Sequence, residues 1–253
     1  MTLRDFDEWA RALLDPDSLA SVDDSLNGIQ VSRPEGELER VAFAVDASLE
    51  TMRRAVEAGA RLLFVHHGIF WGKPLRVEGF HRERLKLLLD SDLALYASHL
   101  PLDRHPVVGN NAVLAGLLGL EDLEPFGSYH GVKIGWKGAF PRPLKLEEAV
   151  ARILPDGTPP NCVLPCGPET IRTAAVVSGG AAFEVSQAID EGVDLYVTGE
   201  ASHSIYGAAV EGRINFVAAG HYRTEVHGVR AVAERLERET GLSTVFVDLP
   251  TGL

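Results

Sequence analysis

Short apolar runs alternate with segments of helical spacing along the first half of the chain. The clearest run is residues 62–65, four apolar side chains in succession, which is typical of a strand buried on both faces. Further runs at residues 41–45 and 93–97 flank it, and predicted helices at residues 48–58 and 81–89 separate the three. This alternation predicts an α/β fold with a mainly parallel sheet.

The same alternation returns in the C-terminal third of the chain. Strands are expected at residues 174–177, 195–197, 214–218 and 244–247, with helices at 183–191, at 202–210 and over a long segment ending near 239. At the other end of the chain, Thr2 is placed to cap a first helix that has Asp5 in its first turn. A short helix is expected at residues 110–118, where Gly119 ends it.

The two runs of elements resemble one another. Gly59 and Gly192 occupy equivalent positions after a predicted helix, at an offset that aligns the following strands without a gap. Both runs also place a histidine and an acidic residue, separated by three residues, just after a strand: the segments 99–103 and 221–225. We infer a duplicated βαβαβ unit, although any two such units share glycine stops and apolar runs.

The pattern is less regular in the middle of the chain. Residues 132–140 suggest an extended segment, residues 145–154 an amphipathic helix, and residues 155–160 a proline-rich loop. We therefore predict a two-lobed α/β protein with an N-terminal lobe at 1–125, a short linking segment at 126–168 and a C-terminal lobe at 169–253.

Composition narrows the class of protein. With 253 residues, 45% of them hydrophobic and 24% charged, the chain has ample length for a buried core. Its net charge of -12 argues against a surface that binds nucleic acid throughout, but leaves a local basic patch open. Residues 1–14 carry charged side chains and no later stretch reaches about 18 consecutive apolar residues, so we expect a cytoplasmic protein without a membrane span.

Two adjacent histidines, His66 and His67, stand where the run at 62–65 ends, with Gly68 directly after them. Ligands of open α/β sheets bind at the carboxyl ends of strands, so this position indicates a site. Neighbouring strand residues point to opposite faces, and a turn at Gly68 is expected to bring the two imidazoles together. The alternatives are that each histidine holds a different ion of a close pair, or that both only cap the strand through hydrogen bonds.

Other strand ends carry polar residues of the same kinds. They are His99, Asp103, Glu200, His203, His221 and Glu225. Imidazole and carboxylate groups suit zinc, iron, manganese, nickel or cobalt, and the two cysteines, Cys162 and Cys166, lack the spacing of a zinc knot. We therefore expect divalent metal ions at these strand ends, with the identity of the metal left open.

Five segments together resemble the Nif-three-like family of dinuclear metal-centre proteins, whose members are described as GTP cyclohydrolase 1 type 2 homologues. They are NGIQV from Asn27, HHG from His66, HLPLD from His99, TGEASH from Thr198 and GHYRTE from Gly220. The resemblance covers nearly the whole chain, but the middle departs from it, because longer relatives carry an inserted domain there. Taken alone, Asn27 to Val31 is either a structural turn or a loop that faces the substrate.

The resemblance implies two lobes that face one another across a two-ion site and assemble into ring-shaped homohexamers. It makes His66, His67, Asp103, His221 and Glu225 the metal ligands. It places His99, Glu200 and His203 beside the ions as candidate catalytic residues.

We therefore expect a dinuclear-metal-dependent hydrolase that acts on a small, nucleotide-like substrate, with a water activated by the metal ions as the nucleophile. The rival interpretation is a ring-shaped regulatory protein that binds nucleic acid or protein and uses its metals structurally. A third possibility is metal trafficking. The basic residues that would serve the rival are Arg82, Arg84, Lys86, Lys133 and Lys137.

Overall fold

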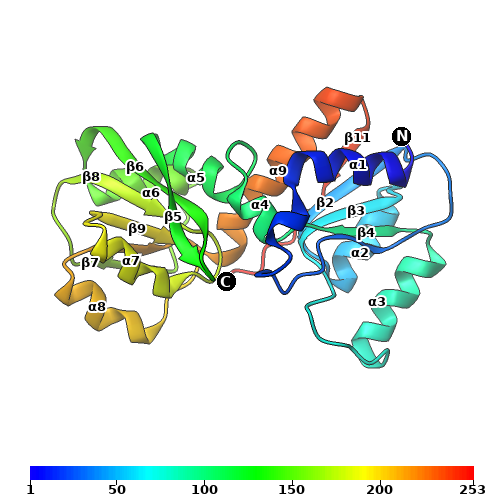
Figure 1. Cartoon of the computed structure of the whole chain (residues 1–253), viewed down its shortest axis with the longest axis horizontal. Helices are drawn as coiled ribbons and strands as arrows, with labels where there is room; N and C mark the ends of the chain where they lie inside the picture. The colour runs from blue at the N-terminus through cyan, green and yellow to red at the C-terminus, as the bar shows by residue number, and fades with distance from the viewer. The chain divides into compact units, whose positions relative to one another are not determined.

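The computed structural model describes residues 1–253 and confirms the predicted α/β class. The chain forms two compact units, each built on one β-sheet (Figure 1). The first comprises Met1–Leu102 and Gly228–Leu249, and the second comprises Asp103–His227 and Pro250–Leu253. No helix combines the length and the apolar composition that crossing a membrane requires.

The first unit contains a five-stranded sheet in the order β1-β4-β3-β2-β11. Strands β2 (Arg40–Asp46), β3 (Leu62–His67), β4 (Ala94–Ala97) and β11 (Ser243–Phe246) run parallel, and β1 (Gly28–Val31) pairs antiparallel with β4. The carboxyl ends of β3 and β4 therefore meet at one edge of the sheet.

Helices cover both faces of this sheet. They are α1 (Leu3–Leu14), the 3₁₀ turn η1 (Pro16–Leu19), α2 (Leu49–Glu57), α3 (Gly79–Asp90) and the part of α9 (His221–Thr240) that belongs to this unit. As the sequence predicted, Thr2 caps α1 by accepting a hydrogen bond from the Asp5 backbone amide. The Asp5 side chain accepts one from the Thr2 backbone amide in return.

Side chains alternate between two apolar layers across the sheet. On one face, the rings of Phe6, Phe64 and Tyr96 lie within 6.4 Å of one another, which joins α1 to β3 and β4. The other face packs Leu63 and Val65 against helices α2 and α3. Burial on both faces explains why β3 has no polar residue before His66.

The second unit contains a six-stranded sheet in the order β5-β6-β8-β9-β10-β7. Its strands are β5 (Glu121–Tyr129), β6 (Val132–Leu144), β7 (Cys162–Pro165), β8 (Ile171–Val176), β9 (Leu195–Thr198) and β10 (Asn215–Ala218). Strands β8, β9 and β10 are parallel, whereas the other three pair antiparallel with their neighbours.

The helices of the second unit lie on both faces of its sheet (Figure 1). They are α4 (Leu100–Arg104), which begins in the first unit, α5 (Asn110–Leu118), α6 (Leu146–Ile153), η2 (Ala182–Glu184), α7 (Val185–Asp190), η3 (His203–Ile205) and α8 (Tyr206–Glu211). The predicted helices at 183–191 and 202–210 thus each begin with a 3₁₀ turn. Tyr196 of β9 packs against Phe126 and Phe216 on one face of the sheet.

The unit boundaries differ from the predicted ones at 125 and 168. The segment predicted to link two lobes supplies the end of β5 and all of β6 and β7 to the second sheet, and it also contains helix α6. Strand β6 joins this sheet by pairing with β8, so its place depends on a distant partner and leaves little trace in local periodicity. The C-terminal strand β11 likewise pairs with a distant partner, β2, and so belongs to the first sheet instead of the predicted C-terminal lobe.

The two sheets share part of their topology. In each, three parallel strands follow one another in a βαβαβ sequence, and a strand that comes earlier in the chain pairs antiparallel with the third of them. Gly59 and Gly192 adopt similar left-handed conformations, with φ of 76° and 69°, before β3 and β9. A duplication would produce this likeness, and the duplication itself stays a prediction.

Candidate metal centre

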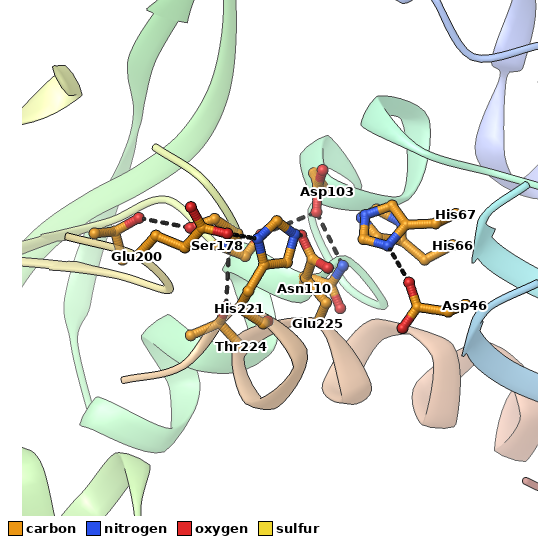
Figure 2. Close-up of polar contacts among 12 residues, drawn as sticks. Asp46, His66, His67, Asp103, Asn110, Ser178, Glu200, His221, Thr224 and Glu225 are labelled. Atoms are coloured by element: carbon orange, nitrogen blue, oxygen red, sulfur yellow. Dashed lines mark hydrogen bonds and ion pairs between the residues drawn. The ribbon is translucent and has the colours of Figure 1, made fainter. Parts of the chain in front are cut away.

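The paired histidines close strand β3. His66 is fully buried and donates a hydrogen bond from Nδ1 to the backbone oxygen of Ser98, at 2.9 Å. His67 donates from Nδ1 to Oδ1 of Asp46, at 2.8 Å (Figure 2). Their ring centroids are 4.6 Å apart, although the strand continues through His67. The expected turn at Gly68 therefore follows the pair, and the rings approach one another within the strand end.

A third imidazole belongs to the same cluster. The ring of His99 lies 5.1 Å from that of His66 and 5.7 Å from that of His67, and the edge of Trp71 packs against it at 5.0 Å. One ring nitrogen from each histidine lies within 4.8 Å of those of the other two. The first unit thus gathers three imidazoles at the carboxyl ends of β3 and β4, and the sequence had placed all three at strand ends.

Each of the three histidines has its Nδ1 atom bonded to an oxygen. The acceptors are the backbone oxygen of Ser98, the carboxylate of Asp46 and the carboxylate of Asp23. Because these oxygens only accept, the proton of the neutral ring lies on Nδ1, which leaves the lone pair of Nε2 for a metal ion. Metal-binding histidines commonly show this arrangement, so the donor set fits a divalent ion.

Asp23 is the most deeply buried of the supporting carboxylates. Besides His99, at 2.8 Å, it accepts hydrogen bonds from the side chain of Asn27 and from the backbone amides of Ser25 and Leu100. Burial by itself raises the pKa of Asp23, but the hydrogen bond and charge of His99, followed by the other donors, outweigh it and hold the pKa below its usual value. The carboxylate therefore stays charged beside His99 at neutral pH.

The segment from Asn27 to Val31 supports the histidines from outside. Gln30 accepts hydrogen bonds at Oε1 from the backbone amides of Ile69 and Phe70, at 2.7 and 3.3 Å, which fixes the chain after His67. A Cβ atom on Gly68 would lie 2.3 Å from the Gln30 amide, so a larger residue there would displace the Gln30 side chain from these hydrogen bonds. Asn27 also accepts from the His99 backbone amide. The segment is therefore structural in this unit.

In the second unit, Asp103 lies almost buried in helix α4. Its Oδ1 atom accepts hydrogen bonds from Nδ2 of Asn110 and from Oγ of Ser178, both at 2.9 Å (Figure 2). Both donors use the same oxygen, and this fixes the orientation of the carboxylate. Neither supporting residue was singled out from the sequence.

His221 and Glu225 lie one turn apart at the start of α9. Nε2 of His221 is 3.1 Å from Oε1 of Glu225, and Nδ1 donates to Oε1 of Glu200 at 2.5 Å (Figure 2). Burial lowers the pKa of His221, but Glu225 and then Glu200 outweigh it through hydrogen bonds and charge, raising the pKa to about 9. The geometry gives Glu200 a position behind the imidazole, where it orients the ring.

A glycine turn after β8 brings the backbone against these residues. Gly179 has φ of 66° and donates its amide hydrogen to Oγ1 of Thr224, at 3.0 Å. A Cβ atom at this position would lie 2.3 Å from Oε1 of Glu225. This turn was not predicted, although the sequence Ser178-Gly179-Gly180 after a strand is typical of one.

His203 belongs to none of the groups of side chains that could hold a metal ion. It is exposed at the start of η3, where Ser202 caps the turn as predicted. It lines a cavity of about 440 Å³ together with Cys162, Leu164 and Tyr206. This cavity adjoins the loop that follows Glu200.

Comparisons with known proteins give a consistent result. The sequence model of Duf34/NIF3 (NGG1p interacting factor 3) matches residues 1–251. A protein of Pyrococcus horikoshii named GTP cyclohydrolase 1 type 2 homolog is 48% identical over 235 residues, which cover 91% of this chain and 92% of that one. Its namesake in Treponema pallidum is 39% identical over the full length of both. The crystal structure of TTHA1606 from Thermus thermophilus is similar, with a TM-score of 0.90, 39% identity and full coverage of both chains.

Proposed function

Because the chain belongs to the Duf34/NIF3 family, we propose that it is a dinuclear-metal-dependent hydrolase that acts on a small, nucleotide-like substrate. The name shared by its relatives, GTP cyclohydrolase 1 type 2 homolog, supports this class of reaction. We propose two divalent ions per chain. The proposed ligands are His66, His67, Asp103, His221 and Glu225.

The observation that carries the proposal is the set of hydrogen bonds that support four of the five proposed ligands. Every ligand histidine has its Nδ1 atom bonded to an oxygen, and Asp103 is held by two donors at one carboxylate oxygen. This arrangement orients ligand atoms before an ion arrives and so lowers the cost of binding one. When bound, such ions polarise a substrate oxygen and lower the pKa of a water molecule.

The protein's own groups are proposed to move protons. His99 stands beside the imidazoles of the first unit, and His203 lines the cavity next to the loop after Glu200. A neutral imidazole can accept a proton from water or donate one to a leaving group near neutral pH. Glu200 is proposed to act through His221, whose ring it holds.

The rival proposal, a nucleic-acid-binding ring, depends on free basic residues. Four of the five candidates are paired with carboxylates: Arg82 with Glu83, Lys86 with Asp90, Lys133 with Glu191, and Lys137 with Glu124 and Glu191. The fifth, Arg84, lies over the ring of Phe80. Such pairing reduces the positive potential that phosphate binding needs, so the hydrolase is favoured.

The test is to load purified protein separately with zinc, iron(II), manganese, nickel and cobalt, and to measure metal content and turnover of a panel of nucleotides that includes GTP. We expect about two ions per chain and turnover that depends on them. The double variant His67→Ala, Glu225→Ala should lose the metal ions and the turnover, whereas the surface variant His130→Asn should keep the metal ions and the turnover. Full metal loading without turnover of any nucleotide would favour the regulatory alternative.

A further inference from the structure

One buried carboxylate supports a histidine that is not among the proposed metal ligands. Asp23 lies in the loop after η1, and its side chain is only 1% exposed. It accepts a hydrogen bond from Nδ1 of His99 at 2.8 Å. A carboxylate is rarely buried this deeply unless its oxygens are fully satisfied, so the contact is a built feature of the fold.

The surroundings of Asp23 keep its carboxylate in place. Oδ1 also accepts from the backbone amide of Ser25 at 2.9 Å, and Oδ2 accepts from Nδ2 of Asn27 at 2.8 Å and from the amide of Leu100 at 3.0 Å. Four donors thus converge on one side chain. Three of these donors are independent of His99, so they hold the carboxylate in place for its contact with the imidazole.

His99 is held from three directions. Asp23 bonds its Nδ1 atom, Asn27 accepts from its backbone amide at 2.8 Å, and the indole of Trp71 packs edge-on against its ring at 5.0 Å. Because a carboxylate only accepts, the proton of the neutral ring lies on Nδ1, and Nε2 can then act as a base. The ring itself lies beside those of His66 and His67.

We propose that Asp23 is the positioning residue of His99: it fixes the tautomer with the proton on Nδ1 and directs Nε2 toward the space beside His66 and His67. There His99 exchanges a proton with water or substrate during hydrolysis. This inference rests on the proposed function and adds to it, because it assigns the orientation of a proton-transfer group to a residue outside all five family segments.

The decisive variant is Asp23→Asn, which keeps the size of the side chain but removes the acceptor-only carboxylate. Nitrogen-15 NMR of histidine-labelled, zinc-loaded protein should report the Nδ1–H tautomer of His99 in the wild type and a change toward Nε2–H in the variant. Metal content should stay at the wild-type value. For any nucleotide that the wild type turns over, kcat should fall about 10²- to 10⁴-fold with KM nearly unchanged.

Three further variants complete the design. Asp24→Asn changes the exposed neighbouring carboxylate and should leave tautomer and turnover unaltered. The double variant Asp23→Asn, His99→Asn should be no slower than His99→Asn alone, because the two residues act as a unit. Asn27→Ala removes one donor to Asp23 and the acceptor of the His99 amide, so it should show a partial change if Asp23→Asn does not fold.

Several results would overturn the inference. Loss of metal in step with activity in Asp23→Asn would make His99 a ligand. An unchanged tautomer, or a changed tautomer with unchanged kcat, would make the contact merely structural. A wild type without any turnover would contradict the proposed function, but the tautomer measurement would still decide whether Asp23 sets the orientation of His99.

Discussion

The carboxylate of Asp46 lies 2.8 Å from Nδ1 of His67, and the two residues are direct partners in the parallel pair of strands β2 and β3. The register of these strands therefore decides the orientation of a proposed metal ligand. A shift of one residue would turn Asp46 to the other face of the sheet and leave His67 without this acceptor.

Replacing Asp46 with alanine should weaken metal binding about 10- to 100-fold, because His67 loses the group that fixes its tautomer and ring orientation. Competition with a chromogenic chelator measures this change. Asp90→Ala removes an exposed carboxylate that pairs with Lys86, and it should bind metal as the wild type does. Equal affinities for the Asp46 variant and the wild type would contradict the support role.

Gly179→Ala should destabilise the protein more than Gly192→Ala. Both glycines have φ near 70°, so both variants incur the backbone cost of about 1 kcal/mol. Only at Gly179 would the new Cβ meet the Glu225 carboxylate, whereas nothing lies within 4 Å at Gly192. Thermal unfolding and metal titration together test this. Equal decreases in stability and in metal affinity in the two variants would show that only the backbone angle matters, and not the contact with Glu225.

The pKa of His221, raised to about 9, predicts how the stability of metal-free protein depends on pH. The protonated imidazole is more stable in the folded state than in the unfolded state, where its pKa is about 6.5. Its contribution is therefore complete below pH 6.5 and is lost as the pH rises through about 9. The difference in unfolding free energy between wild type and His221→Gln should shrink across this range, and a constant difference would contradict the prediction.

His203→Ala should reduce turnover while the protein keeps its metal ions, because the side chain lines the cavity beside the loop after Glu200 and belongs to none of the groups of side chains that could hold a metal ion. Metal analysis and kcat are measured on the same preparation. The surface variant His130→Ala serves as the control. Joint loss of metal and activity would make His203 a ligand, and full activity would make it structural.

We expect a homohexamer, on the basis of the family resemblance alone. Light scattering at micromolar concentration should then give a mass of about six times the 27.4 kDa of one chain. A monomer mass under these conditions would refute this expectation.

The sequence by itself determined the local elements and the positions of the proposed ligands along them. The apolar run before His66 defined β3, Thr2 and Asp5 marked the start of α1, and the helix at Asn110–Leu118 has the predicted limits. These features depend on periodicity and capping within a few residues, which a sequence displays directly. The fold class followed from their order, and the family from five short segments.

Only the tertiary structure decided which residues support the proposed ligands and His99. Asp23 is 76 residues from His99, Asp46 is 21 from His67, and Ser178 is 75 from Asp103. The contribution of residues 126–168 to the second sheet was equally hidden, because β6 finds its partner β8 across an intervening helix and strand. Strand register and packing set such contacts, and no local pattern records which distant residues a sheet brings face to face.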